Sequence, residues 1–424
     1  MVRLALWGYA LLLMALSPLY GLRLLWRARA EPLYAHALGE RFGFYAHPHD
    51  QGVWIWVHAV SLGETRAAAA LIEALRAQQP GMRLLLTHGT ATGRAAGQPL
   101  LRPGDVQVWM PLDTPGAVRR FLQHFRPRVG VLMETEVWPQ LIHQAQGQRL
   151  PVVLANGRLS ERSLRRGQRW GMLLRPAVQG LRLVMAQTDA DAGRFKQAGA
   201  RNLVVCGNLK FDMQPNAAQV LQGQGWRNSM NRAVVLAAST REGEEGLLLA
   251  AWKKQTAEVR DPPLLLIVPR HPQRFDEVAQ LITARDFVLA RRSQWDQAPG
   301  TDVEAADVWL GDSLNEMALY YGVAQVALLG GSFAPLGGQN LIEALACGCP
   351  VVMGPHTFNF AQAAELALNA EVAWRVADVE AGVARALALV KSTANESLSE
   401  KSKGFVSPHR GAAQTMAAHV LSVL

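Results

Sequence analysis

The stretch VWIWVHAVSLGETRAAAA, residues 53–70, decides the fold class. An apolar run of strand length at 53–57 leads through a short glycine-containing loop into an alanine-rich segment of helix length. A run that is apolar at every position is typical of a strand buried on both faces of a parallel sheet. The loop therefore places His58, Ser61 and Glu64 at the carboxyl end of a strand, where doubly wound α/β domains bind their ligands.

The same alternation of strand and helix continues on both sides of a polar interruption. Further apolar runs occur at 83–87, 129–133, 151–155, 181–186, 202–206, 233–239, 263–270, 325–332 and 350–355. The interruption after Asn208 is rich in Gln, Asn and Gly and reaches Asn231. We therefore expect an α/β fold of two Rossmann-like domains that face a central cleft.

The expected segments are a membrane anchor (1–26), an N-terminal domain (27–215), a linker (216–232) and a C-terminal domain (233–424). The last helical segment, from about Gly411 to Leu424, has no strand after it. It could pack back on the N-terminal domain.

Composition excludes several classes of protein. The 424 residues are 50% hydrophobic and 18% charged, which excludes intrinsic disorder. Three cysteines, Cys206, Cys347 and Cys349, cannot form a disulfide framework and lack the spacing of a metal site, so a reducing compartment fits best. The formal net charge of +9 predicts attraction to nucleic acid, an acidic membrane or a phosphorylated substrate. Neither a P-loop nor an H-E-x-x-H motif occurs, so we expect no P-loop NTPase and no obligatory metal.

An uncharged segment, LALWGYALLLMALSPLYGL, lies between Arg3 and Arg23. As a helix it would be about 28 Å long, close to the thickness of a bilayer's hydrocarbon core. We interpret it as a membrane anchor, which could be spanning, re-entrant or interfacial. Because one arginine precedes it and several follow closely, the positive-inside rule places the rest of the chain in the cytoplasm. A signal peptide cleaved after Ala28-Arg29-Ala30 is the alternative, which the intervening arginines disfavour.

Acidic side chains follow two of the expected strands of the N-terminal domain. Glu64 begins a helix and is a candidate general base if it lies in a cleft, although an acid in a first helical turn also satisfies the helix dipole. Glu134 and Glu136, in ETEVWP (134–139), emerge after the run at 129–133. They could divide acid and base roles through shifted pKa values or form a solvated loop.

Basic side chains follow other strands of the same domain. The segment NGRLSERSLRRGQRW (156–170) carries Arg158, Arg162, Arg165, Arg166 and Arg169. These arginines could hold phosphate groups, lie against anionic lipid or form a solvated helix face. Lys210, in GNLKFD, could project into the cleft or be an ordinary surface lysine. Nucleic acid is not expected, because no aromatic platform, zinc spacing or recognition helix accompanies the charge.

In the C-terminal domain, Arg270 and His271 follow a strand, and a guanidinium there suits a phosphate. The segment GGSFAPLGGQNLIEALACGCPVVMGPHTFNF (330–360) is a glycine-rich loop before a helix that begins near Asn340. Free N–H groups at that helix start could bind a phosphate while Glu343 faces ribose hydroxyls. The spacing of Asn340 and Glu343 is also that of a capping box, and both roles can hold. Asn315 and Glu316, in GDSLNEM (311–317), are further candidates for this pocket.

The chain resembles the Kdo transferases (3-deoxy-D-manno-octulosonic acid transferases) of lipopolysaccharide synthesis. The resemblance covers nearly the whole chain, and the family patterns stand in family order as HAVSLGE, ETEVWP, NGRLSERS, GNLKFD, PRHPQRF, GDSLNEM, GGQNLIE and MGPHTFNF. The chain departs from the family at Gln140, Gly157, Gln339 and Leu341, where Asn, Ala, His and Pro are usual. Gln339 and Leu341 flank the donor loop, so they put donor affinity in question.

The resemblance implies a GT-B glycosyltransferase that moves Kdo from CMP-Kdo to a lipid A precursor, lipid IVA, with inversion and without a metal or other cofactor. It places the enzyme at the cytoplasmic face of the inner membrane, with the acceptor on the N-terminal domain. Glu64 matches the family's general base, and Glu134 and Lys210 match positions that stabilise the transition state. The implied CMP contacts are Arg270, His271, Leu314, Asn315, Glu316, Asn340, Leu341, Ile342 and Glu343. The implied acceptor side comprises Ser61, Gly63, Glu136, Arg158 and Arg162.

Two other functions stay open at this point. A GT-B protein for another nucleotide sugar, or an epimerase of related architecture, would prefer UDP to CMP. A membrane-tethered binding protein would bind nucleotide without turnover, and the presence of Glu64, Arg270 and Glu343 argues against it.

Overall fold

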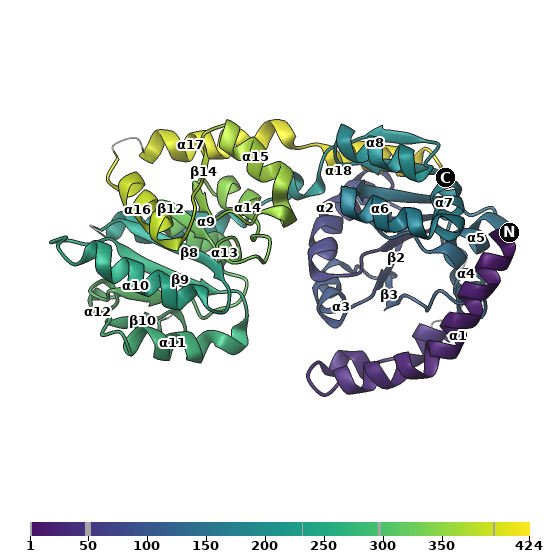
Figure 1. Cartoon of the computed structure of the whole chain (residues 1–424), viewed down its shortest axis with the longest axis horizontal. Coiled ribbons are helices and arrows are strands. Elements are labelled where there is room, and N and C mark those ends of the chain that lie inside the picture. The colour runs from purple at the N-terminus through teal and green to yellow at the C-terminus, as the bar shows by residue number, and fades with distance from the viewer. Residues whose placement is uncertain (1, 47–51, 231, 296–297, 393–394) are drawn as a thin grey trace. The chain divides into compact units, whose positions relative to one another are not determined.

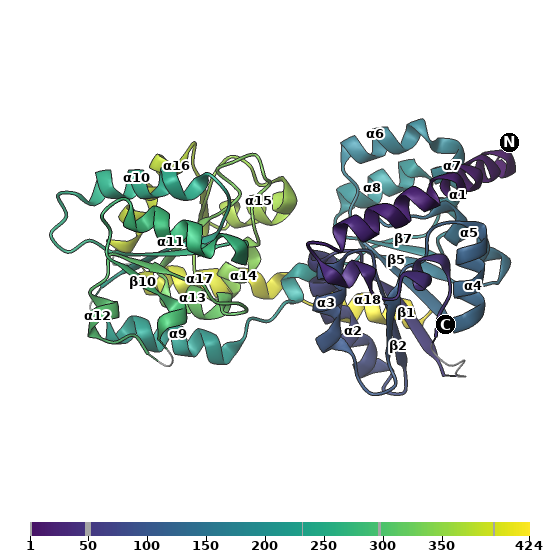
Figure 2. The same cartoon turned by 90° about the horizontal axis from the view of Figure 1, so that it is seen from below.

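The computed structural model describes residues 2–46, 52–230, 232–295, 298–392 and 395–424. The chain divides into two compact units. Unit 1 comprises Met1–Asp212 and His409–Leu424, and unit 2 comprises Met213–Pro408. Each unit has a seven-stranded parallel sheet between layers of helices (Figures 1 and 2). The expected α/β class is thereby confirmed.

The sheet of unit 1 has the strand order β3-β2-β1-β4-β5-β6-β7. Its strands are β1 (Trp54–His58), β2 (Arg83–His88), β3 (Val106–Trp109), β4 (Val129–Met133), β5 (Val152–Gly157), β6 (Leu183–Ala186) and β7 (Leu203–Val205). Strand β1 pairs with β2 on one side and with β4 on the other. The direction of winding therefore reverses between β1 and β4, which is the switch point where doubly wound folds bind ligands.

Helices cover both faces of this sheet. The helices of unit 1 are α1 (Val2–Arg27), α2 (Leu62–Gln78), α3 (Ala91–Gly97), α4 (Pro115–Phe125), α5 (Pro139–Gly147), α6 (Glu161–Arg169), α7 (Gly171–Gly180), α8 (Asp189–Ala198) and α18 (Ala412–Leu421), with the 3-10 turns η1 (Pro32–Ala35), η2 (Leu38–Phe42), η3 (Gln98–Leu100) and η4 (Leu209–Asp212). Successive residues of β1 point to opposite faces, as a strand requires. Ile55 joins a buried cluster with Leu71 of α2 and Met416 of α18, while Trp56 packs with Phe121 of α4 on the other face.

The sheet of unit 2 has the order β10-β11-β9-β8-β12-β13-β14, so its switch point lies between β8 and β12. The strands are β8 (Val234–Thr240), β9 (Leu264–Pro269), β10 (Leu289–Arg291), β11 (Val308–Leu310), β12 (Val326–Leu329), β13 (Val351–Met353) and β14 (Ala373–Arg375). The helices are α9 (Ala217–Ser229), α10 (Glu244–Thr256), α11 (Phe275–Thr283), α12 (Thr301–Glu304), α13 (Met317–Val323), α14 (Leu341–Ala346), α15 (Ala361–Asn369), α16 (Val379–Val390) and α17 (Asn395–Val406), and the 3-10 turns are η5 (Pro272–Arg274), η6 (Arg292–Gln294), η7 (Phe358–Phe360) and η8 (Ser407–His409).

Most of the segment expected to be a linker, residues 217–229, instead forms helix α9 of unit 2. Asn216 caps this helix by accepting hydrogen bonds from the backbone N–H groups of Ala218 and Gln219. A Cβ at Gly223 of α9 would overlap the carbonyl oxygen of Leu319 in α13, so the two helices pack with their backbones close together. A glycine contact has no apolar periodicity, which is why the sequence pattern did not predict this helix.

Helix α1 is long and apolar enough to cross a membrane. Leu6, Ala10 and Leu24 are buried, and the Nε2 atom of Gln140 donates a 2.9 Å hydrogen bond to the Leu6 carbonyl. The exposed large apolar side chains of this helix include Leu4, Trp7, Leu11, Leu12, Leu16, Leu19, Leu22, Leu25 and Trp26. This surface is compatible with membrane anchoring.

Helix α18 returns from the end of the chain to pack against α2 in unit 1. The carboxylate of Asp212 accepts hydrogen bonds from the backbone N–H groups of Gly411 (2.6 Å) and Ala413 (2.7 Å) at the start of α18. One carboxylate thus satisfies two of the free N–H groups that a helix start presents. Because α2 carries Glu64, this contact helps fix the helix on which the candidate base lies.

We expect Asp212→Ala to lower the free energy of unfolding by about 1–2 kcal/mol, because two backbone donors of α18 lose their partner. Urea unfolding measures the loss of free energy. In a separate experiment, hydrogen exchange read by mass spectrometry should show that the amides of α18 exchange faster than in wild type. Asp378→Ala is a matched control, since Asp378 caps α16 of unit 2 through the N–H of Ala381. Unchanged exchange in α18 of the Asp212 variant would contradict the role given to this carboxylate.

Candidate active site

The candidate carboxylates of unit 1 lie at the two strands that flank the switch point. Glu64 is in the first turn of α2, directly after β1, and Glu134 directly follows β4. Strands β1 and β4 are hydrogen-bonded neighbours with parallel direction, so their carboxyl ends meet at one edge of the sheet. The structure therefore brings Glu64 and Glu134 to the same edge, although seventy residues separate them in sequence.

Hydrogen bonds orient the Glu64 carboxyl group. Its Oε2 atom accepts from the backbone N–H of Val60 at 2.8 Å, and its Oε1 atom accepts from the Ser61 hydroxyl at 3.1 Å. Ser61 is also the N-cap residue of α2 and accepts from the backbone N–H of Glu64. These bonds resemble those of a capping box and set the side-chain direction at this helix start.

Burial raises the pKa of Glu64 from its ordinary value of 4.5 to about 7. The negative charges of Glu134 and Glu136 raise this pKa further, whereas the hydrogen bonds from Val60 and Ser61 lower it. A carboxyl group that titrates near neutral pH exists in both protonation states under physiological conditions. Glu64 can therefore accept a proton from a hydroxyl group and release it again.

Glu134 forms an ion pair with Lys210, another of the predicted site residues. The Lys210 Nζ atom lies 3.8 Å from the Glu134 Oε1 atom, and both side chains are largely buried. The backbone of Glu134 is left-handed, with φ of 55°. A non-glycine residue in that region marks a turn that surrounding contacts must hold, as expected of a functional position.

Glu136 extends the acidic cluster. Its Oε2 atom accepts a 2.6 Å hydrogen bond from the indole N–H of Trp138. Burial raises the pKa of Glu136, as does the charge of Glu134, whereas the Trp138 hydrogen bond lowers it. Repulsion by neighbouring carboxylates thus contributes to the raised pKa values of both Glu64 and Glu136.

His58 of the same motif has a structural place. Its ring is fully buried against Trp138 in an edge-on arrangement, and its Nδ1 atom is 2.9 Å from the Thr87 hydroxyl. Burial lowers the pKa of His58 to about 3, so the imidazole is neutral near pH 7. It supports the floor of the site and carries no charge there.

Most of the predicted acceptor-side residues lie at this edge of the sheet, but Arg162 does not. Ser61 and Glu136 lie in the carboxylate cluster, and Gly63 lies beside Ser61 at the start of α2. The backbone N–H of Arg158 donates to the Glu134 carbonyl at 3.2 Å, so Arg158 also belongs to this edge. Arg162 instead lies on the exposed face of α6, together with Arg165, Arg166 and Arg169.

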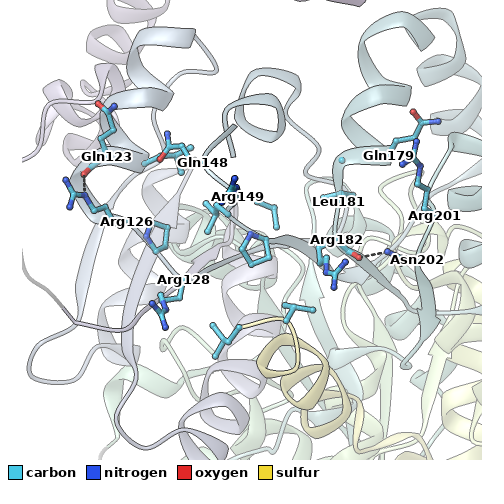
Figure 3. Close-up of a pocket in the computed structure, with 18 residues that line it drawn as sticks. Gln123, Arg126, Arg128, Gln148, Arg149, Gln179, Leu181, Arg182, Arg201 and Asn202 are labelled. Carbon is cyan, nitrogen blue, oxygen red and sulfur yellow. Dashed lines mark hydrogen bonds between the residues drawn. The ribbon is translucent and has the colours of Figure 1, made fainter. Parts of the chain in front are cut away.

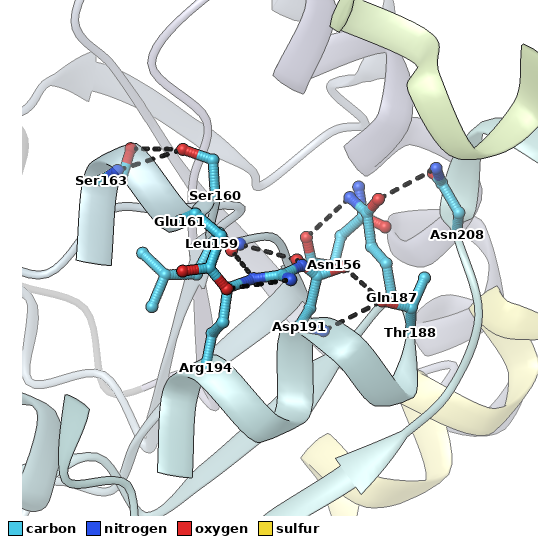
Figure 4. Close-up of polar contacts among 10 residues, drawn as sticks. All are labelled: Asn156, Leu159, Ser160, Glu161, Ser163, Gln187, Thr188, Asp191, Arg194 and Asn208. Atoms are coloured by element: carbon cyan, nitrogen blue, oxygen red, sulfur yellow. Dashed lines mark hydrogen bonds and ion pairs between the residues drawn. The ribbon is translucent and has the colours of Figure 1, made fainter. Parts of the chain in front are cut away.

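Three amide side chains that sequence reasoning did not single out connect the loops of this edge (Figure 4). Gln187 donates to the Asn156 carbonyl, and Asn208 donates to the Gln187 side-chain oxygen. Each of these amides stands close after an apolar run of strand length. That position at the carboxyl end of consecutive strands was the signal that could have found them.

In unit 2, Arg270 follows β9, and its backbone N–H donates to the Thr240 carbonyl at the end of β8. His271 is exposed beside it. Partial burial lowers the pKa of His271, and the positive charges of Arg241, Arg270 and Arg274 lower it further. A group of guanidinium ions at the carboxyl edge of a parallel sheet suits an anionic ligand.

The glycine-rich loop of unit 2, which follows β12, packs against the end of β8 and the start of α10. The backbone N–H of Gly331 donates to both Glu244 carboxylate oxygens, at 2.8 and 2.9 Å. A Cβ at Gly330 would overlap the carbonyl oxygen of Ser239, so this position requires glycine. Gly330 and Gly331 thus allow the ends of β12 and β8 to lie close together.

Asn340 is the N-cap of α14, and its side-chain oxygen accepts from the backbone N–H of Ile342 at 3.2 Å. Asn340 therefore caps this helix, which is the N-cap half of the predicted capping box. Leu341 and Ile342 have buried side chains, so only their backbone is available to a nucleotide. Glu343 is partly buried one residue further along.

The residues of the GDSLNEM motif have different environments. Leu314 is 65% exposed, and the Asn315 carbonyl accepts a 2.9 Å hydrogen bond from the Gln219 side chain. The Glu316 carboxylate pairs with Arg292 at 2.9 Å. The negative charge of Glu316 is thus paired with the positive charge of Arg292, whereas the Leu314 side chain is accessible to solvent.

A separate cavity of about 950 Å³ lies at the amino ends of strands β4 to β7 in unit 1 (Figure 3). The arginines that line it are Arg126, Arg128, Arg149, Arg182 and Arg201. None of the predicted site residues lines it. Across the described ranges, no group of three or more His, Cys, Asp or Glu side chains could hold a metal ion.

Comparison with known proteins gives a consistent result. The family profile for 3-Deoxy-D-manno-octulosonic-acid transferase (kdotransferase) matches residues 36–213. The 3-deoxy-D-manno-octulosonic acid transferase of Bordetella pertussis is 46% identical over 416 residues, which cover 95% of this chain and 96% of that protein. The protein of the same name from Haemophilus influenzae is 36% identical, over 78% of this chain and 77% of that protein.

Solved structures share the fold at low sequence identity. A glycosyltransferase from Rickettsia africae superposes with a TM-score of 0.57 and 12% identity, covering 88% of this chain and 99% of that one. UDP-GlcNAc 2-epimerase from Neisseria meningitidis superposes with a TM-score of 0.56 and 14% identity, covering 87% and 99%. These likenesses establish the two-domain α/β architecture and nothing about the substrate.

We expect Glu64→Gln to stabilise the fold increasingly as pH rises. Below pH 4.5 the folded and unfolded wild-type chains are both protonated at Glu64, so the variant gains little. Between pH 4.5 and 7 the unfolded carboxyl ionises while the folded one stays protonated, and wild-type stability falls. Urea unfolding at pH 5, 6, 7 and 8 measures the difference. Glu242→Gln, at an exposed position, controls for the loss of a carboxylate, and identical pH dependence of Glu64→Gln and wild type would refute the raised pKa.

Proposed function

Because the chain belongs to the 3-deoxy-D-manno-octulosonic acid transferase family and is therefore a glycosyltransferase, we propose that it moves Kdo from CMP-Kdo to lipid IVA with inversion. One observation carries the mechanistic part of this proposal. A carboxyl group with a pKa of about 7, Glu64, lies at the switch point of unit 1 and is influenced by the charge of Glu134. This arrangement supports general-base activation of a sugar hydroxyl.

In the proposed reaction, ionised Glu64 removes the proton from an acceptor hydroxyl group. The oxygen attacks the anomeric carbon of Kdo while the bond from that carbon to the phosphate oxygen of CMP breaks. The proton remains on Glu64, and CMP leaves with the bonding electron pair. Attack from the face opposite the leaving group inverts the anomeric centre. The hydrogen bonds from Val60 and Ser61 aim the carboxylate during this step.

The charged groups of the two units take separate roles in this proposal. Glu134 and Lys210 stabilise charge that develops as the glycosidic bond forms and breaks, because a partly buried pair needs little reorganisation. On unit 2, the guanidinium of Arg270 meets the CMP phosphate. The remaining donor contacts proposed are His271, Leu314, Asn315, Glu316 and the segment Asn340–Glu343. Phosphate charge met by arginine and lysine makes a metal ion unnecessary, so we propose that none is used.

The membrane part of the proposal rests on helix α1. Its exposed apolar face is compatible with anchoring at the inner membrane, with the catalytic units on the cytoplasmic side. The net charge of +9 favours an anionic bilayer surface and a phosphorylated acceptor. Arg158 and Arg162 are the proposed contacts to acceptor phosphates.

The reaction is tested by incubating the detergent-solubilised full chain with CMP-Kdo and lipid IVA. We expect release of CMP together with Kdo-sized mass increments on the glycolipid, and the number of increments counts the sugars added. Glu64→Ala should reduce the rate by about 10²–10⁴-fold, because the attacking hydroxyl loses its base. The wild-type rate should rise as pH increases through 7, when Glu64 ionises.

Two results would contradict the proposed reaction. A folded protein that binds CMP without modifying lipid IVA would exclude this acceptor, and selective binding of UDP would exclude CMP-Kdo as donor. Transfer that persists in Glu64→Ala at the wild-type rate would leave the reaction but exclude Glu64 as its base.

Arg270→Ala tests the donor side. We expect the KM for CMP-Kdo to rise about tenfold or more, which corresponds to the loss of a charge-assisted hydrogen bond to phosphate, while the KM for lipid IVA changes little. Arg260→Ala, which removes an exposed arginine of the same unit, is the matched control. An unchanged donor KM in Arg270→Ala would remove this residue from the donor site.

A further inference from the structure

Asn156 lies between two segments of unit 1, the turn at Glu134 and the loop 208–210. It is fully buried near the carboxyl end of β5, with φ of 54°. Its neighbour Ala155 accepts a 2.9 Å hydrogen bond from the backbone N–H of Glu134, and the Glu134 carbonyl accepts from the N–H of Arg158. The backbone of Glu134 is therefore tied to β5 on both sides of Asn156.

The side chain of Asn156 reaches the second loop, residues 208–210. Its Oδ1 atom accepts from the backbone N–H of Leu209 at 3.1 Å. A second path runs through two further amides (Figure 4): the Gln187 Nε2 atom donates to the Asn156 carbonyl at 3.0 Å, and the Asn208 Nδ2 atom donates to Gln187 at 3.1 Å. Asn208 in turn accepts from the backbone N–H of Lys210 at 3.0 Å.

These bonds fix the backbone from which the Lys210 side chain starts. A lysine has many rotamers, so its ammonium stays at one place only when its Cα is held and a partner is near. The partner is Glu134, whose own backbone is held by the same strand end. Asn156 thus bonds to the Lys210 loop and also adjoins the Glu134 turn.

The amide of Asn156 is not optimised for stability. Its Nδ2 atom is buried, and no hydrogen-bond partner for it occurs in the described part of the chain. A buried donor without a partner costs folding free energy. Local features that reduce stability concentrate at functional sites.

We propose that Asn156 is a positioning residue of the transfer site, which holds the 208–210 loop so that the Lys210 ammonium lies against the Glu134 carboxylate. This role rests on the proposed function, because Lys210 and Glu134 are its predicted transition-state residues. Asn156 acts on the reaction through Lys210 and touches no reacting atom.

The first test needs no turnover. Asn156→Gly removes the amide and keeps the left-handed backbone, which glycine adopts without strain. Limited acetylation of the full chain, read by mass spectrometry, should modify Lys210 at least about threefold faster in this variant than in wild type, because a largely buried side chain that leaves its place beside Glu134 becomes accessible to the reagent. Asn156→Asp keeps an oxygen acceptor for the Leu209 N–H, and Lys210 should stay protected in it.

Arg149→Gly is the matched control for backbone effects. Arg149 also has positive φ, 57°, and lies before the start of the same strand, β5, at the edge remote from Glu134. The control should leave Lys210 acetylation and transfer rates at their wild-type values. Hydrogen exchange of the β5 amides verifies that each variant is folded.

The second test uses kinetics. A misplacement of about 1 Å in a catalytic group costs on the order of 100-fold in rate, so kcat should fall by 10- to 100-fold in Asn156→Gly while both KM values change by less than about threefold. If Asn156 acts through Lys210, the double variant Asn156→Gly, Lys210→Ala should have the kcat of Lys210→Ala alone.

The outcomes separate the two proposals. Additive losses in the double variant, or equal Lys210 acetylation in wild type and Asn156→Gly, would overturn the positioning role. A wild-type chain that transfers no Kdo would refute the proposed function, and the acetylation result would still decide whether Asn156 positions Lys210.

Discussion

The pairing of β1 with β4 is the constraint on which the rest of unit 1 depends. These strands are hydrogen-bonded neighbours although β2 and β3 lie between them in the chain, so the winding of the sheet reverses there. Parallel strands release their loops at the same edge, and at the reversal these loops lead away in opposite directions along the sheet. Glu64 and Glu134 emerge at this point, and the loop of Lys210 joins them through β5.

Burial of carboxyl groups at this edge lowers the free energy of unfolding of unit 1. Desolvation raises the pKa of Glu64 into the neutral range, and like charges at Glu134 and Glu136 add to it. A group chosen for stability alone would be neutral or fully paired. The same desolvation keeps a proton acceptor ready near pH 7, so the instability and the proposed reactivity have one physical origin.

Elements far along the chain support this edge. Helix α18, at the C-terminal end, packs on α2 behind Glu64, and the Asp212 carboxylate fixes its first turn only two residues after Lys210. In unit 2 the equivalent edge is closed by Gly330 and Gly331 against the end of β8. In both units, hydrogen bonds from backbone N–H groups to a carboxylate thus hold elements that support this edge.

The sequence by itself determined the fold class and the family, because buried parallel strands must be apolar at every position and the motifs at their ends keep their order. It also placed Glu64 and Arg270 at strand ends, whereas the pattern of apolar runs did not predict the short strands β3, β10, β11 and β14 or the glycine-packed helix α9. Only the tertiary structure decided that Glu134 adjoins Glu64, that amides tie Asn156 to the Lys210 loop, and that Glu64 titrates near pH 7. Strand neighbours and desolvation arise from contacts between residues distant in sequence, so no local pattern encodes them.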